Sequence, residues 1–276
     1  MAISAKEVNK LRQMTGAGMM DCKKALTEAD GDFDAAIDLL RKKGQKVSAS
    51  RADRDATEGS VFVKTNDDNT EGVLVALNCE TDFVGKNEEF LGLGNNILKV
   101  AFDSNAQSID ELKSQKIGDL TIEEKITEFV GKIGEKIEIS EFVRLQGEAV
   151  VPYIHAGSKL GVLVALKGVN GTNVEEAGRD VGMQIAAMNP VAVDKDGVDD
   201  ATVQKEIEIG KEQALAEGKP ENIVEKIAQG KLQKFFKDNT LLNQQFVKDS
   251  SQSVQAYLDT VNKGLTVTEF KRVAIG

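Results

Sequence analysis

The chain has 276 residues, of which 41% are hydrophobic, and a formal net charge of −10 at pH 7. This length can bury real cores, whereas the negative charge argues against nucleic acid as a direct partner, because phosphate binding depends on clustered Lys and Arg. Two cysteines without a CxxC motif, one histidine and no tryptophan offer little for a disulfide framework, a zinc site, acid–base catalysis or base stacking. We expect a protein without cofactor or metal that acts through its surfaces.

No apolar run approaches the ~18 residues that a membrane-spanning helix needs. The N-terminus, MAISAKEVNK, lacks the basic and then apolar order of a signal peptide. We therefore expect a cytoplasmic protein without a membrane partner. Residues 41–46 are a candidate basic patch within this acidic balance.

The N-terminal segment predicts three short helices. Ser4 and Glu7 form a capping-box pattern before the first, the second is expected around 21–29, and Asp32 can cap the third. Gly44 is a natural stop for this third helix. Bundles this small are usually only marginally stable, and they often serve as docking modules.

Two features of this segment each allow two interpretations. Met19 and Met20 follow a glycine turn, so they either fill the bundle's own core or present an adaptable apolar surface to a partner. Residues 45–59 are densely charged and read as a linker or as a frayed extension of the third helix.

A strand-like hairpin follows, and its second strand ends at the corner 78–84, NCETDFV. In one interpretation Thr81 or Asp82 caps the next helix and Phe83 packs beneath the corner. In the other, the corner is an exposed wedge: Asp82 adds negative charge near a partner's cation, and Phe83 fills an apolar crevice as an anchor.

Helical spacing resumes over 90–101, residues 103–119 look polar and irregular, and Thr121 with Glu124 caps a further amphipathic helix. From 137 to 145 the apolar period changes to two, which predicts a strand that closes the sheet.

The sequence GVLVAL at 72–77 recurs letter for letter at 161–166, with an apolar segment before each copy and a helical pattern after it. We therefore expect two similar halves, each a strand hairpin covered by a helix, the second helix being capped by Asn173 with Glu176. Only the first copy carries the acidic and aromatic corner.

Two helical patterns joined by the turn at 218–220 predict an antiparallel helical hairpin. The two helices carry too few apolar side chains to form a core of their own. We therefore expect a partner, such as a second copy of the chain, to cover them. A short helix over 254–261 and an alternating strand over 265–273 complete the second half.

No catalytic residue is predicted. The sequence lacks the GxxxxGK[ST], GxGxxG, HExxH and GxSxG patterns. His155 lies beside a turn without a matched nucleophile, which is typical of a hydrogen-bonded loop residue.

Five segments together resemble bacterial translation elongation factor Ts: 11–26, 31–44, 78–84, 154–166 and 216–236. The resemblance implies a guanine-nucleotide exchange factor for elongation factor Tu, whose bundle is similar to ubiquitin-associated domains and docks on the GTPase. It further implies that the corner enters beside the nucleotide site and dislodges Mg²⁺, that His155 acts on the phosphate-loop side, and that the helical hairpin dimerises. The implied residues are Thr81, Asp82, Phe83 and Val84 for Mg²⁺ dislocation, and Arg12, Met19, Met20 and His155 for partner binding. The alternative is a non-catalytic adaptor or scaffold that joins partners through the bundle and the helical hairpin.

The expected fold class is α+β. The expected domains are a three-helix docking domain with linker (1–55), a first core half (56–146), a second core half (147–191, completed by 240–276) and a helical hairpin (192–239).

Overall fold

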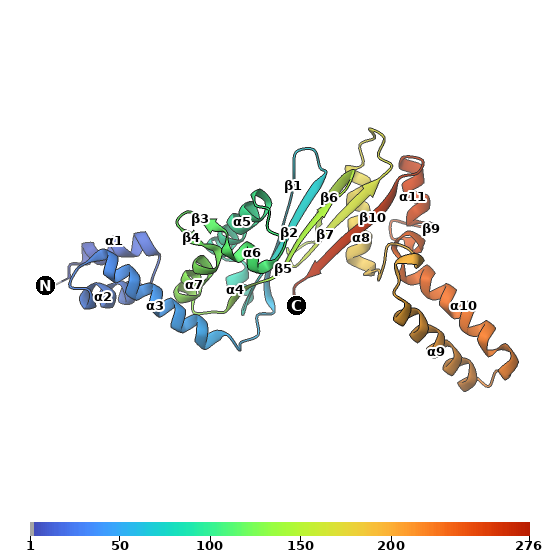
Figure 1. Ribbon diagram of the computed structural model, residues 1–276, viewed down its shortest axis with the longest axis horizontal. Helices are drawn as coiled ribbons and strands as arrows, with labels where there is room; N and C mark the ends of the chain where they lie inside the picture. The colour runs from blue at the N-terminus through green and yellow to red at the C-terminus, as the bar shows by residue number, and fades with distance from the viewer. Residues whose placement is uncertain (1–2) are drawn as a thin grey trace. The chain divides into compact units, whose positions relative to one another are not determined.

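The computed structural model describes residues 3–276 and has the predicted α+β architecture (Figure 1). The helices are α1 (Ala5–Thr15), α2 (Met19–Glu28), α3 (Phe33–Arg51), α4 (Asp82–Gly85), α5 (Glu88–Asp103), α6 (Ile109–Ser114), α7 (Ile122–Ile133), α8 (Glu175–Met188), α9 (Asp200–Ala216), α10 (Glu221–Asn239) and α11 (Val254–Val261). The strands are β1 (Glu58–Thr65), β2 (Glu71–Cys79), β3 (Lys116–Ile117), β4 (Leu120–Thr121), β5 (Ile137–Gln146), β6 (Ala149–Ile154), β7 (Leu160–Lys167), β8 (Gln245–Phe246), β9 (Asp249–Ser253) and β10 (Thr266–Ala274).

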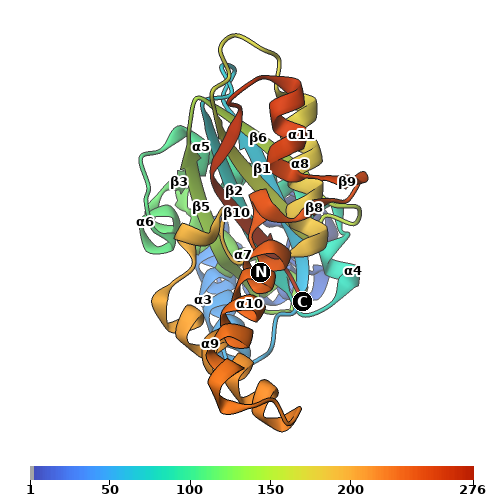
Figure 2. The ribbon, with the colours of Figure 1, turned by 90° about the vertical axis from the view of Figure 1, so that its right-hand side faces the viewer.

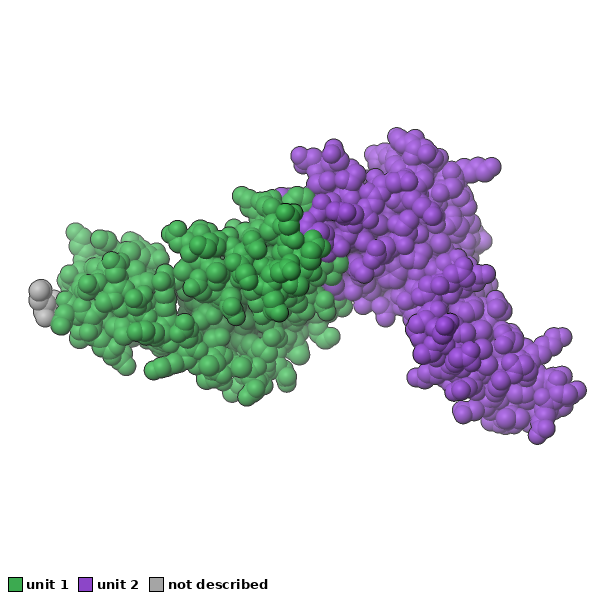
Figure 3. Space-filling model, viewed as in Figure 1, with its two compact units in different colours: residues 1–62, 74–143, 274–276 green, residues 63–73, 144–273 purple. Residues whose placement is uncertain are grey.

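The chain forms two compact units (Figure 3). Unit 1 comprises residues 1–62, 74–143 and 274–276, and unit 2 comprises residues 63–73 and 144–273. The boundary between them passes through several strands, β1 and β2 among them. The four domains expected from the sequence stay a prediction.

The N-terminal three-helix bundle is confirmed. Ser4 and Glu7 form the predicted capping box, and Gly16 ends α1 in the left-handed conformation with φ +67°. The core of the bundle is small and consists of Val8, Leu11, Cys22, Ala25, Leu26 and Ala36. Such a core leaves much of each helix free to face solvent or a partner.

The third helix does not stop at Gly44, so that prediction was wrong. α3 continues to Arg51, and Gly44 is buried within it. Glycine is needed at this position because α3 crosses α7 closely there: a Cβ on Gly44 would lie 3.1 Å from the carbonyl oxygen of Thr127. Gly44 is therefore selected by packing rather than by helix termination, and 45–51 is the helix extension that the sequence left open.

The first sheet has the strand order β1-β2-β5, so β5 closes it as predicted. β2 is buried along its length, and α5 packs closely on β1, since a Cβ on Gly94 would lie 2.1 Å from Phe62 Cζ. The expectation that 103–119 is irregular was partly wrong. Ser108 caps the short helix α6, which buries Leu112, and β3 pairs with β4.

The second sheet has the order β10-β7-β6, with Val151 opposite Val164 in an antiparallel pair. In both sheets a hairpin is followed by helices, and the third strand pairs with the second strand of the hairpin. This shared topology confirms the two similar halves that the repeat predicted.

The helix on the second sheet, α8, begins differently from the prediction. Asn173 Oδ1 accepts the N–H of Glu175 at 3.0 Å, but the helix starts after Val174, which makes no side-chain cap, and Glu176 completes no capping box. Small residues on α8 allow close contact with the sheet: a Cβ on Gly178 would lie 2.4 Å from Val151 Cγ2.

The predicted helical hairpin is confirmed: α9 and α10 lie side by side (Figure 2). Asp199 caps α9, and Gly218 turns the chain with φ +70°. Mostly small residues are buried in the hairpin, namely Gly210, Ala214, Val224, Ala228 and Leu232. Within residues 3–276, no helix combines the length and the hydropathy that crossing a bilayer requires.

Candidate partner-binding site

The corner after β2 forms a single helical turn. Thr81 is the N-cap of α4, and its Oγ1 accepts the N–H of Val84 at 3.5 Å. Val84 is buried and fixes the turn to the body of unit 1. We refer to residues Thr81–Val84 as the tip.

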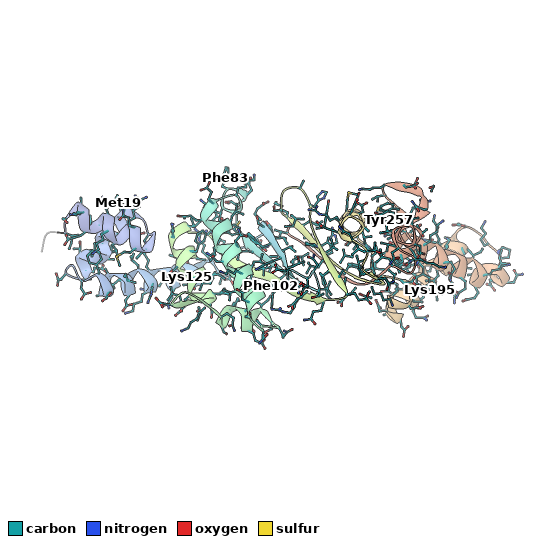
Figure 4. The ribbon with its side chains drawn as sticks, turned by 90° about the horizontal axis from the view of Figure 1, so that it is seen from above. Met19, Phe83, Phe102, Lys125, Lys195 and Tyr257 are labelled. Atoms are coloured by element: carbon teal, nitrogen blue, oxygen red, sulfur yellow. The ribbon has the colours of Figure 1, made fainter. Side chains whose placement is uncertain are left out.

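Phe83 points away from the protein (Figure 4). Its exposed fraction, 83%, is the largest among the large hydrophobic residues of the described chain. The first interpretation is thus right in one part and wrong in the other. Thr81 caps the helix, but Phe83 does not pack beneath the corner. An apolar ring held in water on a turn fixed by Thr81 and Val84 is typical of a binding anchor.

Asp82 presents a half-exposed carboxylate beside this ring. Its Oδ2 accepts a hydrogen bond from Lys86 Nζ at 2.7 Å, one turn along the chain. This hydrogen bond and the negative charge of Asp82 raise the pKa of Lys86. The pair is exposed to solvent, so a partner's cation or hydrogen-bond donor can compete with Lys86 for Asp82 at little cost.

Two glutamates behind the tip were not found by sequence reasoning. Glu135 accepts hydrogen bonds from both the N–H and the hydroxyl of Thr81, at 3.0 and 2.7 Å. Glu80 accepts the N–H of Lys136 at 2.7 Å and pairs with Arg51 at 3.2 Å. Because these contacts join residues far apart in the chain, only a weak signal existed: Glu80 directly precedes the tip.

On the bundle, the two methionines are surface residues. Met19 is 44% exposed and Met20 is 73% exposed, so the interpretation that both fill the core is wrong. They form the first turn of α2, and Arg12 on α1 is exposed as well. In Figure 4 Met19 and Phe83 project at the same edge of unit 1. Apolar surface is thus available at two places on this unit.

His155 lies in unit 2, in the turn between β6 and β7. It is exposed, and its Nδ1 is 3.0 Å from the hydroxyl of Tyr153. The turn is held by the N–H of His155, which donates to the carbonyl oxygen of Leu160 at 2.9 Å. This is the hydrogen-bonded loop histidine that the sequence favoured.

The described residues hold little other reactive chemistry. Residues 3–276 contain no group of three or more His, Cys, Asp or Glu side chains placed to bind a metal ion. Cys22 and Cys79 are buried cysteines outside any disulfide, and burial raises the pKa of the Cys22 thiol. A raised pKa disfavours the thiolate, which is the nucleophilic form.

Comparison with known proteins places the chain in a family. Residues 80–276 match the family model described as "Elongation factor TS". The chain is 56% identical over 276 residues to elongation factor Ts of Amoebophilus asiaticus, with 100% of both chains covered. It is 58% identical over 274 residues to elongation factor Ts of Cytophaga hutchinsonii and 56% identical over 275 residues to that of Christiangramia forsetii, with 99% of each chain covered. The chain therefore belongs to the elongation factor Ts family, the guanine-nucleotide exchange factors, not enzymes, that act on elongation factor Tu in translation elongation.

Proposed function

We propose that the chain releases GDP from elongation factor Tu by inserting its tip, Thr81–Val84, beside the nucleotide site, where the tip dislodges the bound Mg²⁺. The exposure of Phe83 on a short turn fixed by Thr81 and Val84 carries this proposal. As a member of a bacterial family of translation factors, the chain acts in the cytoplasm, as the sequence predicted.

The mechanism is differential binding. Mg²⁺ in a GTPase is held by the phosphates and a few protein oxygens, so a small displacement of these groups weakens the nucleotide strongly. A factor that binds the opened, Mg²⁺-free state more tightly than the closed state accelerates nucleotide loss, and by linkage the nucleotide weakens the factor. The chain itself makes and breaks no covalent bond.

Asp82 and Phe83 divide this task. The ring of Phe83 fills an apolar crevice between helices of the GTPase and so holds the opened state. The carboxylate of Asp82 leaves Lys86 and accepts hydrogen bonds from N–H or O–H donors that surround the metal site.

The bundle supplies docking energy. Met19 and Met20 are exposed apolar residues that lie against the GTPase, and Arg12 adds a charged contact. His155 in unit 2 contacts the phosphate-loop side of the same partner. These roles correspond to the docking domain and the two core halves predicted from the sequence.

Stopped-flow release of labelled GDP from elongation factor Tu tests the role of the tip. Asp82→Ala and Phe83→Ala are each expected to slow the accelerated release by about tenfold or more, since truncation of a hot-spot residue costs about 2 kcal/mol or more. The control is Val191→Ala, which truncates an exposed apolar side chain of the other unit, unit 2, and should leave the rate unchanged.

The same experiment separates exchange from the alternative function. An adaptor or scaffold would bind elongation factor Tu without changing the rate of GDP release, and its tip variants would behave like the wild type. Unchanged release by both tip variants would therefore overturn the proposal and favour the scaffold.

We also propose a homodimer through the helical hairpin. Leu215 near the end of α9 and Ile223 near the start of α10 are exposed, 52% and 38%, although the helices pack on each other. A second copy of the hairpin would cover them. Sedimentation velocity should show a dimer that the variant L215K/I223K loses, and a monomeric wild type over the whole concentration range contradicts the proposal.

A further inference from the structure

Two carboxylates of unit 1 lie behind the tip: Glu80, which directly precedes it, and Glu135, which is far away in the sequence. We propose that Glu135 and Glu80 form a clamp that positions the tip, so that the maximal rate of exchange depends on them. This inference rests on the proposed function of the tip. In it Glu135 and Glu80 are positioning residues that act through Thr81.

Glu135 controls the orientation of Thr81. Its Oε2 accepts the backbone N–H of Thr81 at 3.0 Å, and its Oε1 accepts the hydroxyl proton at 2.7 Å. Because the hydroxyl gives its only proton to Glu135, its lone pairs are left for the N–H of Val84, 3.5 Å away. The carboxylate thus selects the hydroxyl orientation that caps α4.

The second half of the clamp runs in the opposite direction. Glu80 Oε1 accepts the N–H of Lys136 at 2.7 Å. Two adjacent residues of one segment, Glu80 and Thr81, are therefore joined reciprocally to two adjacent residues of the other, Glu135 and Lys136. Each carboxylate accepts the backbone N–H of the residue that follows the other carboxylate.

Arg51 completes the arrangement. Its Nη1 lies 3.4 and 3.2 Å from the two carboxylate oxygens of Glu80, whose side chain is only 16% exposed. Arg51 is the last residue of α3, the helix that begins in the N-terminal bundle. The last residue of α3, a helix of the docking bundle, thus forms an ion pair with Glu80, the residue that precedes the tip.

The tip needs such support because its own structure is weak. α4 has four residues, far fewer than an isolated helix needs to persist in water. Phe83 is exposed and contributes little packing, so Val84 is the anchoring apolar side chain of the tip. A tip without the clamp would sample many conformations, and insertion beside the nucleotide would have to order them first.

The test is Glu135→Gln, measured by stopped-flow GDP release from elongation factor Tu over a series of factor concentrations. The amide keeps the shape of the side chain but loses one acceptor and the charge, so we expect the saturating rate to fall about tenfold. The half-saturating concentration should stay unchanged, because the bundle still docks. Glu138→Gln is the matched control: Glu138 lies on β5 and pairs with Lys136 Nζ at 3.1 Å, and its loss should leave both quantities unchanged.

A pair of substitutions at Thr81 separates positioning from general stability. Thr81→Ser keeps both donors and should retain the saturating rate, whereas Thr81→Val loses the hydroxyl and should behave like Glu135→Gln. Alkylation of Cys79 reports the order of the tip, because its Sγ lies 3.1 Å from the carbonyl oxygen of Thr81. Glu135→Gln should speed this alkylation while the thermal unfolding midpoint stays close to that of the wild type.

Phe83→Ala is measured in parallel to keep the two proposals apart. Slow exchange by Phe83→Ala with a wild-type saturating rate for Glu135→Gln overturns the clamp alone. Unchanged exchange by Phe83→Ala overturns the function of the tip itself. A Glu135→Gln effect confined to the half-saturating concentration also overturns the clamp, since it would place Glu135 in docking.

Discussion

Gly131 of α7 faces Gly44 of α3 at backbone contact: a Cβ on Gly131 would lie 2.7 Å from Gly44 Cα. The two helices can approach this closely only because both residues lack a side chain. Gly131→Ala must push them apart, and we expect a loss of about 1–3 kcal/mol in the free energy of unfolding, as for other overpacked cores. Denaturant unfolding followed by circular dichroism measures it.

The control for this prediction is Gly230→Ala in α10. A Cβ there meets nothing within 4 Å, and the residue is inside a helix. Alanine should therefore stabilise the chain by about 0.5–1 kcal/mol, because it loses less backbone entropy on folding than glycine. Equal effects of the two substitutions would show that the α3–α7 crossing is not tightly packed.

Phe83 and Phe90 are predicted to differ sharply in their effect on stability. Phe83 is 83% exposed, whereas Phe90, in α5 of the same unit, is fully buried. Phe83→Ala should change the free energy of unfolding by less than about 0.5 kcal/mol, and Phe90→Ala should cost about 3–5 kcal/mol. A large loss for Phe83→Ala in thermal or denaturant unfolding would mean that the ring is buried in solution.

Much of the fold could be predicted because the signals are local. The capping boxes at Ser4 and Thr121 and the repeat at 72–77 and 161–166 depend on neighbouring residues, and each predicted its element correctly. Gly44 shows where this fails. A glycine after a periodic run usually marks a helix end, but its partner here, Gly131, lies far away in the sequence.

In the site, too, features set by neighbouring residues could be predicted, and features set by tertiary contacts could not. The tip itself could be singled out, because an acid and an aromatic residue follow a buried strand directly. Whether Phe83 and Met20 face inward or outward could not be predicted from the residues alone, since both are apolar and the choice depends on the packing of α4 and α2. Glu135 gave no signal, because its contact with Thr81 exists only in the folded chain.

Tyr257 is predicted to resist ionisation. Its ring stacks on Phe246 with centroids 4.1 Å apart, and its hydroxyl donates to Asp180 Oδ2 at 3.0 Å. Burial and then the hydrogen bond to Asp180 raise its pKa. In Tyr153→Phe, which leaves Tyr257 as the one tyrosine, absorbance of tyrosinate at about 295 nm should be absent at about pH 10, the normal pKa, while the fold persists.

This raised pKa links stability to pH. The folded state binds the phenolic proton more tightly than the unfolded state, so the contribution of Tyr257 is complete below about pH 10 and is lost as pH rises further. Tyr257→Phe should remove this part of the alkaline loss of stability. Tyrosinate formation at about pH 10 in the folded Tyr153→Phe protein would contradict the hydrogen bond to Asp180.

Met20→Lys should separate docking from exchange. Met20 is 73% exposed, so the substitution leaves the fold intact but places a charge in the proposed contact with elongation factor Tu. The half-saturating factor concentration in the GDP-release assay should rise about tenfold, as for the loss of an apolar anchor, while the saturating rate stays unchanged because the tip is untouched. Met188→Lys, at an exposed methionine of unit 2 (47%), is the control and should change neither value. Since Glu135→Gln is expected to do the opposite, a fall in the saturating rate of Met20→Lys would show that the bundle and the tip do not act as separate devices.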